Sequence, residues 1–249
     1  MSEENNLQNL TSKERYDLKK AETELVSKQH RRRLTRRVLF WTFALLIIVG
    51  AVLGMVKLSG TPPSNQTALL TDAVSSSDWS RGNQEAKVIF VEYSDFQCPA
   101  CSAYYPLLKK LNEDFGGKIK FIYRHFPLRQ IHKNAELAAH AAEAAGRQGK
   151  FWQMHDMLFE NQNNWSGKSG SDAEDTFASY ARSLNLDVER FNKDLDLKDI
   201  KEKVENDYQS GVRSQVNATP TFFLNGAKFE NPRSYEELRS RIEQEVGVN

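Results

Sequence analysis

The chain's only two cysteines, Cys98 and Cys101, stand three positions apart in the stretch SDFQCPACSAYYP. A pair at this spacing can bind a metal, form a structural disulfide or exchange electrons with other thiols. The residues before the pair have a strand pattern and those after it a helix pattern, which places the first sulfur at a helix N-terminus. Free backbone N–H groups and the helix dipole stabilise a thiolate there, and Pro99 is tolerated in the first helical turn. This placement favours thiol–disulfide exchange.

The two other interpretations of the pair are weaker. A structural zinc site requires four ligands, and the chain has neither a second cysteine pair nor a compact histidine pair to complete one. The five histidines are His30, His125, His132, His140 and His155. A structural disulfide across so small a loop would constrain little of the unfolded chain. We therefore expect no metal, and expect the Cys98–Cys101 pair itself to be the redox-active group.

Glu92 lies six residues before Cys98, in the stretch AKVIFVEYSDF, where apolar residues occupy both alternating faces of the expected strand. It shares a face with Val88 and Phe90. An ionised carboxylate in such a buried run is costly unless it is paired or functional. We expect Glu92 to lie beneath the cysteines, with a raised pKa, and to exchange protons with Cys101. The alternative is a strand-end glutamate that pairs with a surface lysine.

The residues around the cysteines predict a strand, a helix and a second strand. The first strand pattern covers residues 86–96, the helical spacing covers 102–115, and the second strand pattern covers 118–126. A glycine pair ends the helix pattern. Strands connected in this order by a helix pair in parallel, so the segment predicts a βαβ unit with the cysteines between its first strand and its helix.

The C-terminal half predicts a long helical region followed by a hairpin and a final helix. Helical patterns continue from about residue 134 to 215 and begin with an alanine-rich run. Two short strands then meet at Asn225-Gly226, which is a hairpin-type turn. The last helix is expected to begin after Ser234, whose side chain caps the backbone of Glu237.

The N-terminal part of the chain has a different composition. Five arginines lie within residues 31–37, and residues 38–56 carry no charge over about the length that a bilayer-spanning helix needs. A cleaved signal peptide would have a shorter apolar core and small residues at a cleavage site, and a buried soluble helix would need a protein shell. We predict a single-pass cell-membrane anchor at 38–56, a cytoplasmic polar tail at 1–37, an extracytoplasmic linker at 57–82 and a catalytic domain outside the cytoplasm.

The stretches VIFVEYSDFQCPAC and ATPTFFLNG, separated by the long helical region, resemble the DsbA-like thiol–disulfide oxidoreductases, in particular a membrane-anchored, BdbD-like branch. The resemblance covers residues 83–247. It implies an α/β thioredoxin fold with an inserted helical subdomain, in a domain spanning 83–249. It also implies a cis peptide bond between Thr219 and Pro220, packed against the cysteines, with the backbone of Thr219 pairing with a substrate strand. Several members of that family carry histidine where this chain has Ala100, so one partner of the thiolate is missing here.

We therefore expect a membrane-anchored, extracytoplasmic oxidoreductase that introduces disulfides into exported, cysteine-containing proteins. No external cofactor is expected, because both electrons stay on the Cys98–Cys101 pair. A quinone-linked membrane partner of the DsbB or vitamin-K-epoxide-reductase type is expected to reoxidise the reduced pair. The alternatives are a reductase or isomerase of exported proteins, and a non-catalytic module that binds peptides or Cu(I). A formal net charge of +1 gives no indication of nucleic-acid binding.

Overall fold

The computed structural model describes residues 20, 40–43, 45–51 and 68–248. The chain divides into two compact units, Met1–Asn65 and Gln66–Asn249. In the first unit, residues 40–43 and 45–51 are helical. Among the described residues, none of the helices combines the length and the apolar character that a bilayer crossing requires. The remaining residues of the predicted tail, anchor and linker, up to residue 67, lie outside the described part of the chain, so these assignments stay predictions.

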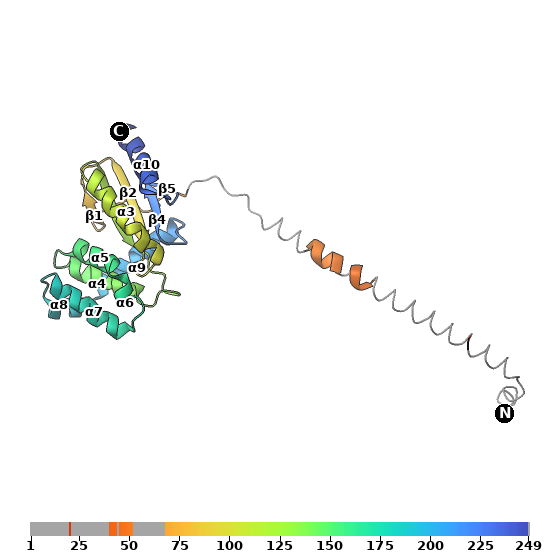
Figure 1. Ribbon diagram of the computed structural model, residues 1–249, viewed down its shortest axis with the longest axis horizontal. Coiled ribbons are helices and arrows are strands. Elements are labelled where there is room, and N and C mark those ends of the chain that lie inside the picture. Colours follow the sequence, from red (N-terminus) through yellow and green to blue (C-terminus); the bar gives the residue numbers. More distant parts are fainter. Residues whose placement is uncertain (1–19, 21–39, 44, 52–67, 249) are drawn as a thin grey trace, which may run out of the picture. The chain divides into compact units, whose positions relative to one another are not determined.

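The second unit is an α/β domain built on one sheet. Its elements, in chain order, are β1 (Trp79–Gly82), β2 (Val88–Ser94), α3 (Pro99–Phe115), β3 (Ile119–His125), α4 (Ala135–Gly146), α5 (Phe151–Glu160), α6 (Gln162–Trp165), α7 (Gly170–Ser183), α8 (Val188–Asp194), α9 (Lys198–Arg213), β4 (Thr221–Leu224), β5 (Ala227–Phe229) and α10 (Tyr235–Val248). The strands lie side by side in the order β1–β3–β2–β4–β5. Figure 1 shows α4 to α8 grouped together beside the sheet, away from α10.

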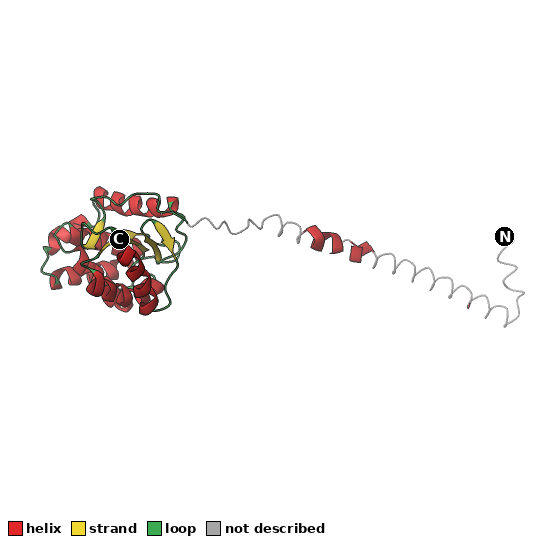
Figure 2. Cartoon of the chain, turned by 90° about the horizontal axis from the view of Figure 1, so that it is seen from above, coloured by secondary structure: helices red, strands yellow, loops and turns green. Residues whose placement is uncertain are grey.

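Each face of the sheet has its own hydrophobic core, because successive side chains of a strand point to opposite sides. In β2, Val88 and Phe90 belong to a large cluster that also contains residues of α3, α5 and α10. Val91 and Tyr93 belong to a second cluster, on which Tyr208 of α9 packs. Helices accordingly lie on either side of the strands (Figure 2). The prediction that β2 is covered on both faces is confirmed.

The expected thioredoxin-type arrangement with a helical insertion is confirmed. β2 and β3 pair in parallel, and α3 connects them. Helices α4 to α9 are inserted between β3 and β4, within the predicted range of 134–215. β4 and β5 form the predicted hairpin, in which Asn225 and Gly226 have φ angles of 49° and 83°, a region that suits asparagine and glycine. The Ser234 hydroxyl accepts the backbone N–H of Glu237 at 3.3 Å, as expected for a cap.

The folded domain begins earlier than the sequence predicts. Residues 57–82 are expected to form a linker, but β1 pairs with β3 at the edge of the sheet. Leu69 forms an antiparallel bridge with Ala227, and the Thr71 hydroxyl donates a hydrogen bond to the carbonyl oxygen of Arg213 at 3.0 Å. The described part of the expected linker therefore belongs to the domain. A strand of four residues is too short for its alternation to be recognised.

A buried ion pair attaches this N-terminal arm, residues 68–78, to the sheet. Arg124 donates hydrogen bonds to both carboxylate oxygens of Asp78, at 2.7 and 2.9 Å, and the two side chains are each only 4% exposed. The same guanidinium donates to the carbonyl oxygens of Asp72 and Ala73, at 3.0 Å each. A buried charge with this many acceptors is well compensated, so the arm is held by Arg124 rather than by apolar packing alone.

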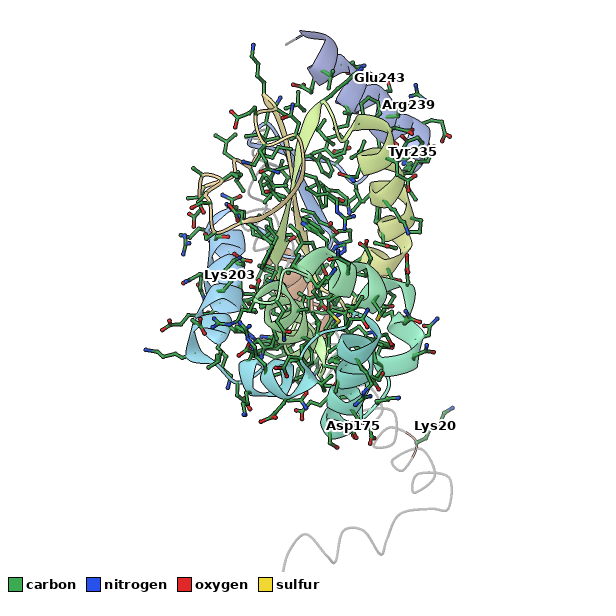
Figure 3. The ribbon with its side chains drawn as sticks, turned by 90° about the vertical axis from the view of Figure 1, so that its left-hand side faces the viewer. Lys20, Asp175, Lys203, Tyr235, Arg239 and Glu243 are labelled. Carbon is green, nitrogen blue, oxygen red and sulfur yellow. The ribbon has the colours of Figure 1, made fainter. Side chains whose placement is uncertain are left out.

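The C-terminal helix, α10, is fixed to α3. Figure 3 shows Tyr235 at the start of α10, and its hydroxyl donates a hydrogen bond to Asp114 of α3. The Lys110 ammonium lies 4.8 Å from the centre of the Tyr235 ring. Further along α10, Arg239 and Glu243 form an exposed ion pair at 2.9 Å, which contributes little to stability. The contacts at Tyr235 therefore support α3, the helix that follows Cys98.

We predict that Asp78→Asn destabilises the domain by about 3 kcal/mol, because it leaves the buried guanidinium of Arg124 without its charged partner. Urea unfolding at pH 7 measures this free energy. The control is Glu189→Gln, which removes an exposed ion pair with Lys193 and should change stability by less than about 0.5 kcal/mol. Equal effects of the two substitutions would show that the buried pair does not anchor the arm.

Candidate active site

The two cysteines lie at the start of α3. Cys98 occupies the N-cap position, with φ −69° and ψ 122°, and Pro99 is the first helical residue. The backbone N–H of Cys98 donates to the carbonyl oxygen of Asp95 at 3.1 Å. Cys98 is 6% exposed and Cys101, one turn further, is 0% exposed, whereas Pro99 and Ala100 are exposed. The predicted position at the helix start is confirmed. Both cysteines are free thiols in this structure, so the contacts described here are those of the reduced pair.

The loop before β4 lies against Cys98. The peptide bond between Thr219 and Pro220 is cis, as the family resemblance implied. The Cys98 thiol donates a hydrogen bond to the carbonyl oxygen of Thr219, with an Sγ to O distance of 3.4 Å. The Asn231 side chain donates to the carbonyl oxygen of Pro220 at 3.0 Å, which supports the other side of the loop. The structure thus brings Cys98, Thr219 and Pro220 together.

The surroundings of the two sulfurs shift their pKa values in opposite directions. A hydrogen bond from the Cys101 thiol is the main reason that the pKa of Cys98 falls to about 5, and the Thr219 side chain and the backbone N–H groups of Cys101 and Ala100 add to it, against the effect of burial. Burial is the main reason that the pKa of Cys101 rises well above its usual value, followed by the hydrogen bond and the charge of Cys98. At neutral pH, the reduced pair therefore carries one negative charge, on Cys98.

Glu92 is buried in the sheet, as predicted. It is 2% exposed, and burial raises its pKa to about 8, with the charge of Cys98 adding to the shift and a hydrogen bond from Ser94 opposing it. Among the described residues it has no ion-pair partner. Lys109 lines the same small cavity as Glu92 but pairs with Glu160 at 2.8 Å. The alternative of a glutamate paired with a surface lysine is therefore not what the structure shows.

Glu92 also interacts with Cys101. Its charge is one of the causes that raise the pKa of Cys101, after burial and the effects of Cys98. The two groups therefore lie within electrostatic range of each other, as expected for a carboxyl group beneath the cysteines. A protonated Glu92 removes this repulsion, so a proton on Glu92 and a thiolate on Cys101 stabilise each other.

The helical subdomain holds the loop between β2 and α3, a feature that the sequence analysis did not predict. The Gln162 amide of α6 donates to the carbonyl oxygen of Cys98 at 3.0 Å. The Gln97 side chain donates to the carbonyl oxygen of Ser166 at 2.7 Å and accepts the backbone N–H of Asn134 at 2.7 Å. These partners lie between 37 and 69 residues away in the sequence, and no local pattern marks them.

Asp95 fixes the same loop from the other side. Its buried carboxylate accepts hydrogen bonds from the backbone N–H groups of Gln97 and Leu128, at 2.7 and 2.9 Å. The ring of His132 lies 2.7 Å from the same carboxylate. His132 is therefore a structural partner of the loop. Across residues 68–248 and the shorter described segments, no group of three or more His, Cys, Asp or Glu side chains is arranged to hold a metal ion.

Comparison with known proteins identifies the class. A family model described as thioredoxin matches residues 75–244, so the chain belongs to the thioredoxin family. The crystal structure of oxidised BdbD from Bacillus subtilis is 26% identical, with a TM-score of 0.63, and the match covers 72% of this chain and 98% of that one. The fold is shared with α-DsbA1 from Wolbachia pipientis, at 24% identity and a TM-score of 0.62, over 70% of this chain and 94% of that one. The likeness to BdbD supports a general role in thiol–disulfide exchange.

Curated relatives that share part of their sequence with this chain carry a different name. The Na(+)/H(+) antiporter NhaA 3 of Salinispora tropica is 36% identical over 165 residues, which is 66% of this chain but 24% of the antiporter. The chain thus spans about a quarter of the length of the curated relatives it matches.

We predict that Cys101→Ala raises the pKa of Cys98 towards that of an ordinary thiol, because it removes the donor that lowers this pKa most. Cys101→Ser is the matched control, since a hydroxyl can still donate to the thiolate and should keep the pKa of Cys98 depressed. Thiolate absorbance near 240 nm, followed from pH 3 to 9, measures both variants. Equal titration midpoints of Cys98 in the Cys101→Ala and Cys101→Ser variants would mean that the helix start, rather than Cys101, lowers the pKa of Cys98.

We predict that Glu92→Gln becomes more stable relative to the wild type as the pH rises from 4.5 to 8. The folded protein binds the Glu92 proton more tightly than the unfolded chain, because the pKa is raised from 4.5 to about 8. The contribution of Glu92 to stability is therefore complete below pH 4.5 and is lost as the pH rises through 8. Urea unfolding of the reduced proteins should show a difference of at most about 4 kcal/mol at pH 8.

Glu143→Gln provides a control of opposite sign. Glu143 is also buried and accepts hydrogen bonds from His125 and Trp79, at 2.8 and 2.7 Å. Burial opposes the shift, but the hydrogen bond of His125 holds the pKa of Glu143 below its usual value. Glu143→Gln should therefore be less stable than the wild type at pH 7. A loss of stability in Glu92→Gln across this pH range would mean that the Glu92 carboxyl group stabilises the fold through a partner, which would contradict the prediction.

Proposed function

We propose that this protein is a membrane-anchored thiol–disulfide oxidoreductase that introduces disulfides into exported proteins. The observation that carries the proposal is the difference between the two sulfurs, since surrounding donors lower the pKa of Cys98 to about 5 while burial raises the pKa of Cys101. The donors stabilise a charge that Cys98 has only in the reduced protein. They therefore favour the reduced form, which makes the Cys98–Cys101 disulfide an oxidant.

Exchange takes place in two displacements. A substrate thiolate attacks Sγ of Cys98 and forms a mixed disulfide, while the Cys98–Cys101 bond breaks and its electron pair goes to Cys101. The Cys101 thiolate takes the proton of Glu92, which a pKa of about 8 keeps protonated at pH 7. A second substrate thiolate then attacks the substrate sulfur of the mixed disulfide and releases Cys98 as a stable thiolate. Two electrons pass from the substrate to the cysteine pair.

The exposed surface beside Cys98 is the proposed substrate site. Pro99 and Ala100 are exposed next to the reactive sulfur. The carbonyl oxygen of Thr219 lies 3.4 Å from the same sulfur, so an extended substrate chain bonded to Cys98 can reach the backbone of Thr219 and pair with it as an added strand. Ala100 has no side chain that can donate to the thiolate, and the Cys101 thiol is the main side-chain donor instead.

The proposed location rests on the sequence. Residues 38–56 carry no charge and follow the arginine cluster at 31–37, which is the pattern of an anchor with a cytoplasmic N-terminus. Exported proteins with paired cysteines are then the substrates, and a quinone-linked membrane protein of the DsbB or vitamin-K-epoxide-reductase type reoxidises the pair. Labelling of reduced Cys98 in intact cells by a membrane-impermeant reagent tests this topology, and protection until lysis would contradict it.

Two alternatives use the same site. A reductase or isomerase would share the fold and the cysteines but have a more negative reduction potential. A binding module for extended peptides or Cu(I) would contact the same surface without exchange. The antiporter activity in the names of the curated relatives is not proposed for this chain, because the chain spans 24% of such a protein.

We predict that Cys98→Ser abolishes thiol–disulfide exchange, and that Cys101→Ser accumulates mixed disulfides with exported proteins, because the Cys101 thiol can no longer attack Cys98 and release the bound substrate. An insulin or peptide exchange assay and non-reducing electrophoresis measure the two effects. Trapping by Cys98→Ser alone would reverse the roles of the cysteines. Binding of peptide by the wild type with no exchange would support the binding module.

The reduction potential separates an oxidase from a reductase. We expect a value between about −120 and about −200 mV, the range between DsbA and the glutaredoxins. The missing partner at Ala100 favours the more negative part of this range. Equilibration with glutathione buffers measures the potential, and a value near about −270 mV, typical of thioredoxin, would support the reductase instead.

A further inference from the structure

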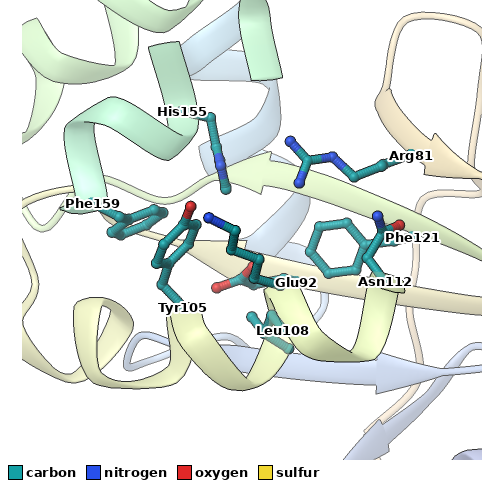
Figure 4. A pocket seen from close by; sticks show the side chains of 9 residues that line it. Arg81, Glu92, Tyr105, Leu108, Asn112, Phe121, His155 and Phe159 are labelled. Carbon is teal, nitrogen blue, oxygen red and sulfur yellow. The ribbon is translucent and has the colours of Figure 1, made fainter. Parts of the chain in front are cut away.

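A small cavity lies between the sheet and the helical subdomain. Its volume is about 10 Å³, close to the smallest space that holds one water molecule. Glu92 lines it from β2 and His155 lines it from α5, and Figure 4 shows their side chains converging on the same space. Most of the remaining wall is formed by Tyr105, Leu108, Phe121 and Phe159. The cavity thus places a polar group of the helical subdomain opposite the proposed proton donor of Cys101.

His155 presents a buried acceptor to this cavity. It is 4% exposed, and its Nδ1 lies 2.9 Å from a carboxylate oxygen of Asp156. The carboxylate accepts a hydrogen bond from the Nδ1–H group, which leaves Nε2 as the acceptor in the neutral ring. Nε2 is buried and has no hydrogen-bond partner among the described residues. Burial lowers the pKa of His155, so the ring is neutral at pH 7.

One water molecule in the cavity would give both Glu92 and Nε2 of His155 a hydrogen-bond partner. Glu92 is protonated at pH 7 and offers an O–H donor, while Nε2 of His155 offers an acceptor. A water between them accepts from Glu92 and donates to His155, and neither group has to be charged. The two cationic side chains that line the cavity, Arg81 and Lys109, are paired with Asp156 and Glu160. A buried acceptor without a partner costs free energy, and polar groups on two sides of a cavity are the condition under which water occupies it.

The path continues from His155 to the surface. Asp156, its partner at Nδ1, has a side chain that is 27% exposed, and it pairs at 3.1 Å with Arg81, whose side chain is 22% exposed. Burial opposes the shift, but the hydrogen bond of His155 and the charge of Arg81 hold the pKa of Asp156 below its usual value. Asp156 therefore stays ionised and can exchange protons with solvent. Asp156, Arg81 and His125 act on the pKa of His155, and Lys109 and Tyr105 are the other titratable groups beside it and Glu92 in the cavity lining.

We propose that His155, through one water molecule bound in this cavity, carries protons between Glu92 and solvent. The inference rests on the thiol–disulfide exchange proposed above. When Cys101 is released as a thiolate, it takes the Glu92 proton. In the oxidised protein the neutral ring carries its proton on Nε2. Glu92 regains a proton from the water, the water takes the Nε2 proton, and Nδ1 takes one from solvent through Asp156, which leaves the ring in the form that the reduced structure holds.

Reoxidation reverses this path. The proton of the Cys101 thiol passes to Glu92 as the proton of Glu92 leaves through the water to Nε2. Nδ1 then gives its proton to Asp156, which releases it to solvent. One proton enters and one leaves in each full cycle, and the ring of His155 alternates between its two neutral forms. His155 does not touch the sulfurs, so it is a positioning residue for the proton.

The test follows the two steps of reoxidation separately in the full-length protein. Quenched-flow mixing of reduced protein with oxidised glutathione at pH 7 resolves the attack of Cys98 from the closure by Cys101. His155→Gln should slow the closure about tenfold or more, since a positioned acid–base group contributes at least this factor. The attack by Cys98 and the titration of its thiolate should not change, because His155 does not contact that sulfur.

Two further variants make the test specific. Asp156→Asn interrupts the path at the surface at a residue that does not itself line the cavity, so it should slow the closure even if His155→Gln folds poorly. In Glu92→Gln, which interrupts the path closer to the sulfur, adding His155→Gln should cause no further loss. The matched control is His140→Gln, because His140 is also a buried histidine of the helical subdomain with an unpartnered Nε2 among the described residues; its closure rate should equal that of the wild type.

The outcomes separate the inference from the proposed function. A wild-type closure rate in both His155→Gln and Asp156→Asn, with slow closure in Glu92→Gln, would overturn the role of His155 and leave the exchange reaction intact. Equal slowing of both steps, or a shifted Cys98 titration in His155→Gln, would mean a structural role and would also overturn it. Absence of exchange in the wild-type protein would overturn the proposed function, and the inference with it.

Discussion

A single negative charge has to be accommodated among three buried groups, Cys98, Cys101 and Glu92, and the rest of the structure follows from this constraint. Each of these groups disfavours ionisation of another, because their charges interact in a region shielded from bulk solvent. The charge settles on Cys98, the only one of the three at a helix start, where backbone N–H groups face the sulfur. Cys101 and Glu92 therefore keep their protons at neutral pH and can pass them to each other.

The position of Cys98 depends on contacts from three parts of the chain. β2 leads into the loop, and the Asp95 carboxylate holds it by accepting the backbone N–H groups of Gln97 and Leu128. The helical subdomain holds the carbonyl oxygen of Cys98 through Gln162. The loop before β4 contributes Thr219, whose carbonyl oxygen accepts the thiol. Because each side of the loop is held by a different element, a shift of any one of them moves the sulfur relative to the donors that stabilise its charge.

Local patterns in the sequence predicted those features that depend on neighbouring residues. The unit formed by β2, α3 and β3, the burial of Glu92 and the hairpin at Asn225 all follow from alternation, helix spacing and turn chemistry. The cis bond at Pro220 came only from the family resemblance, because base rates for a single proline do not favour it. β1 and the arm before it were assigned to a linker, since their stability comes from Arg124 and from pairing with β3. Such long-range contacts leave no periodic signal in the chain.

The helical subdomain influences the chemistry of the sheet as well as the shape of the surface. Phe159 and His155 of α5 cover Phe96, with ring centres 5.0 and 5.6 Å apart, and both also line the cavity beside Glu92. This cover removes water from the carboxyl group, which is the main reason for its raised pKa. A thioredoxin-type sheet without the inserted helices would leave this face more open, and Glu92 would titrate closer to its ordinary value. The inserted helices therefore determine the pH range in which Glu92 is protonated, although they contribute neither cysteine.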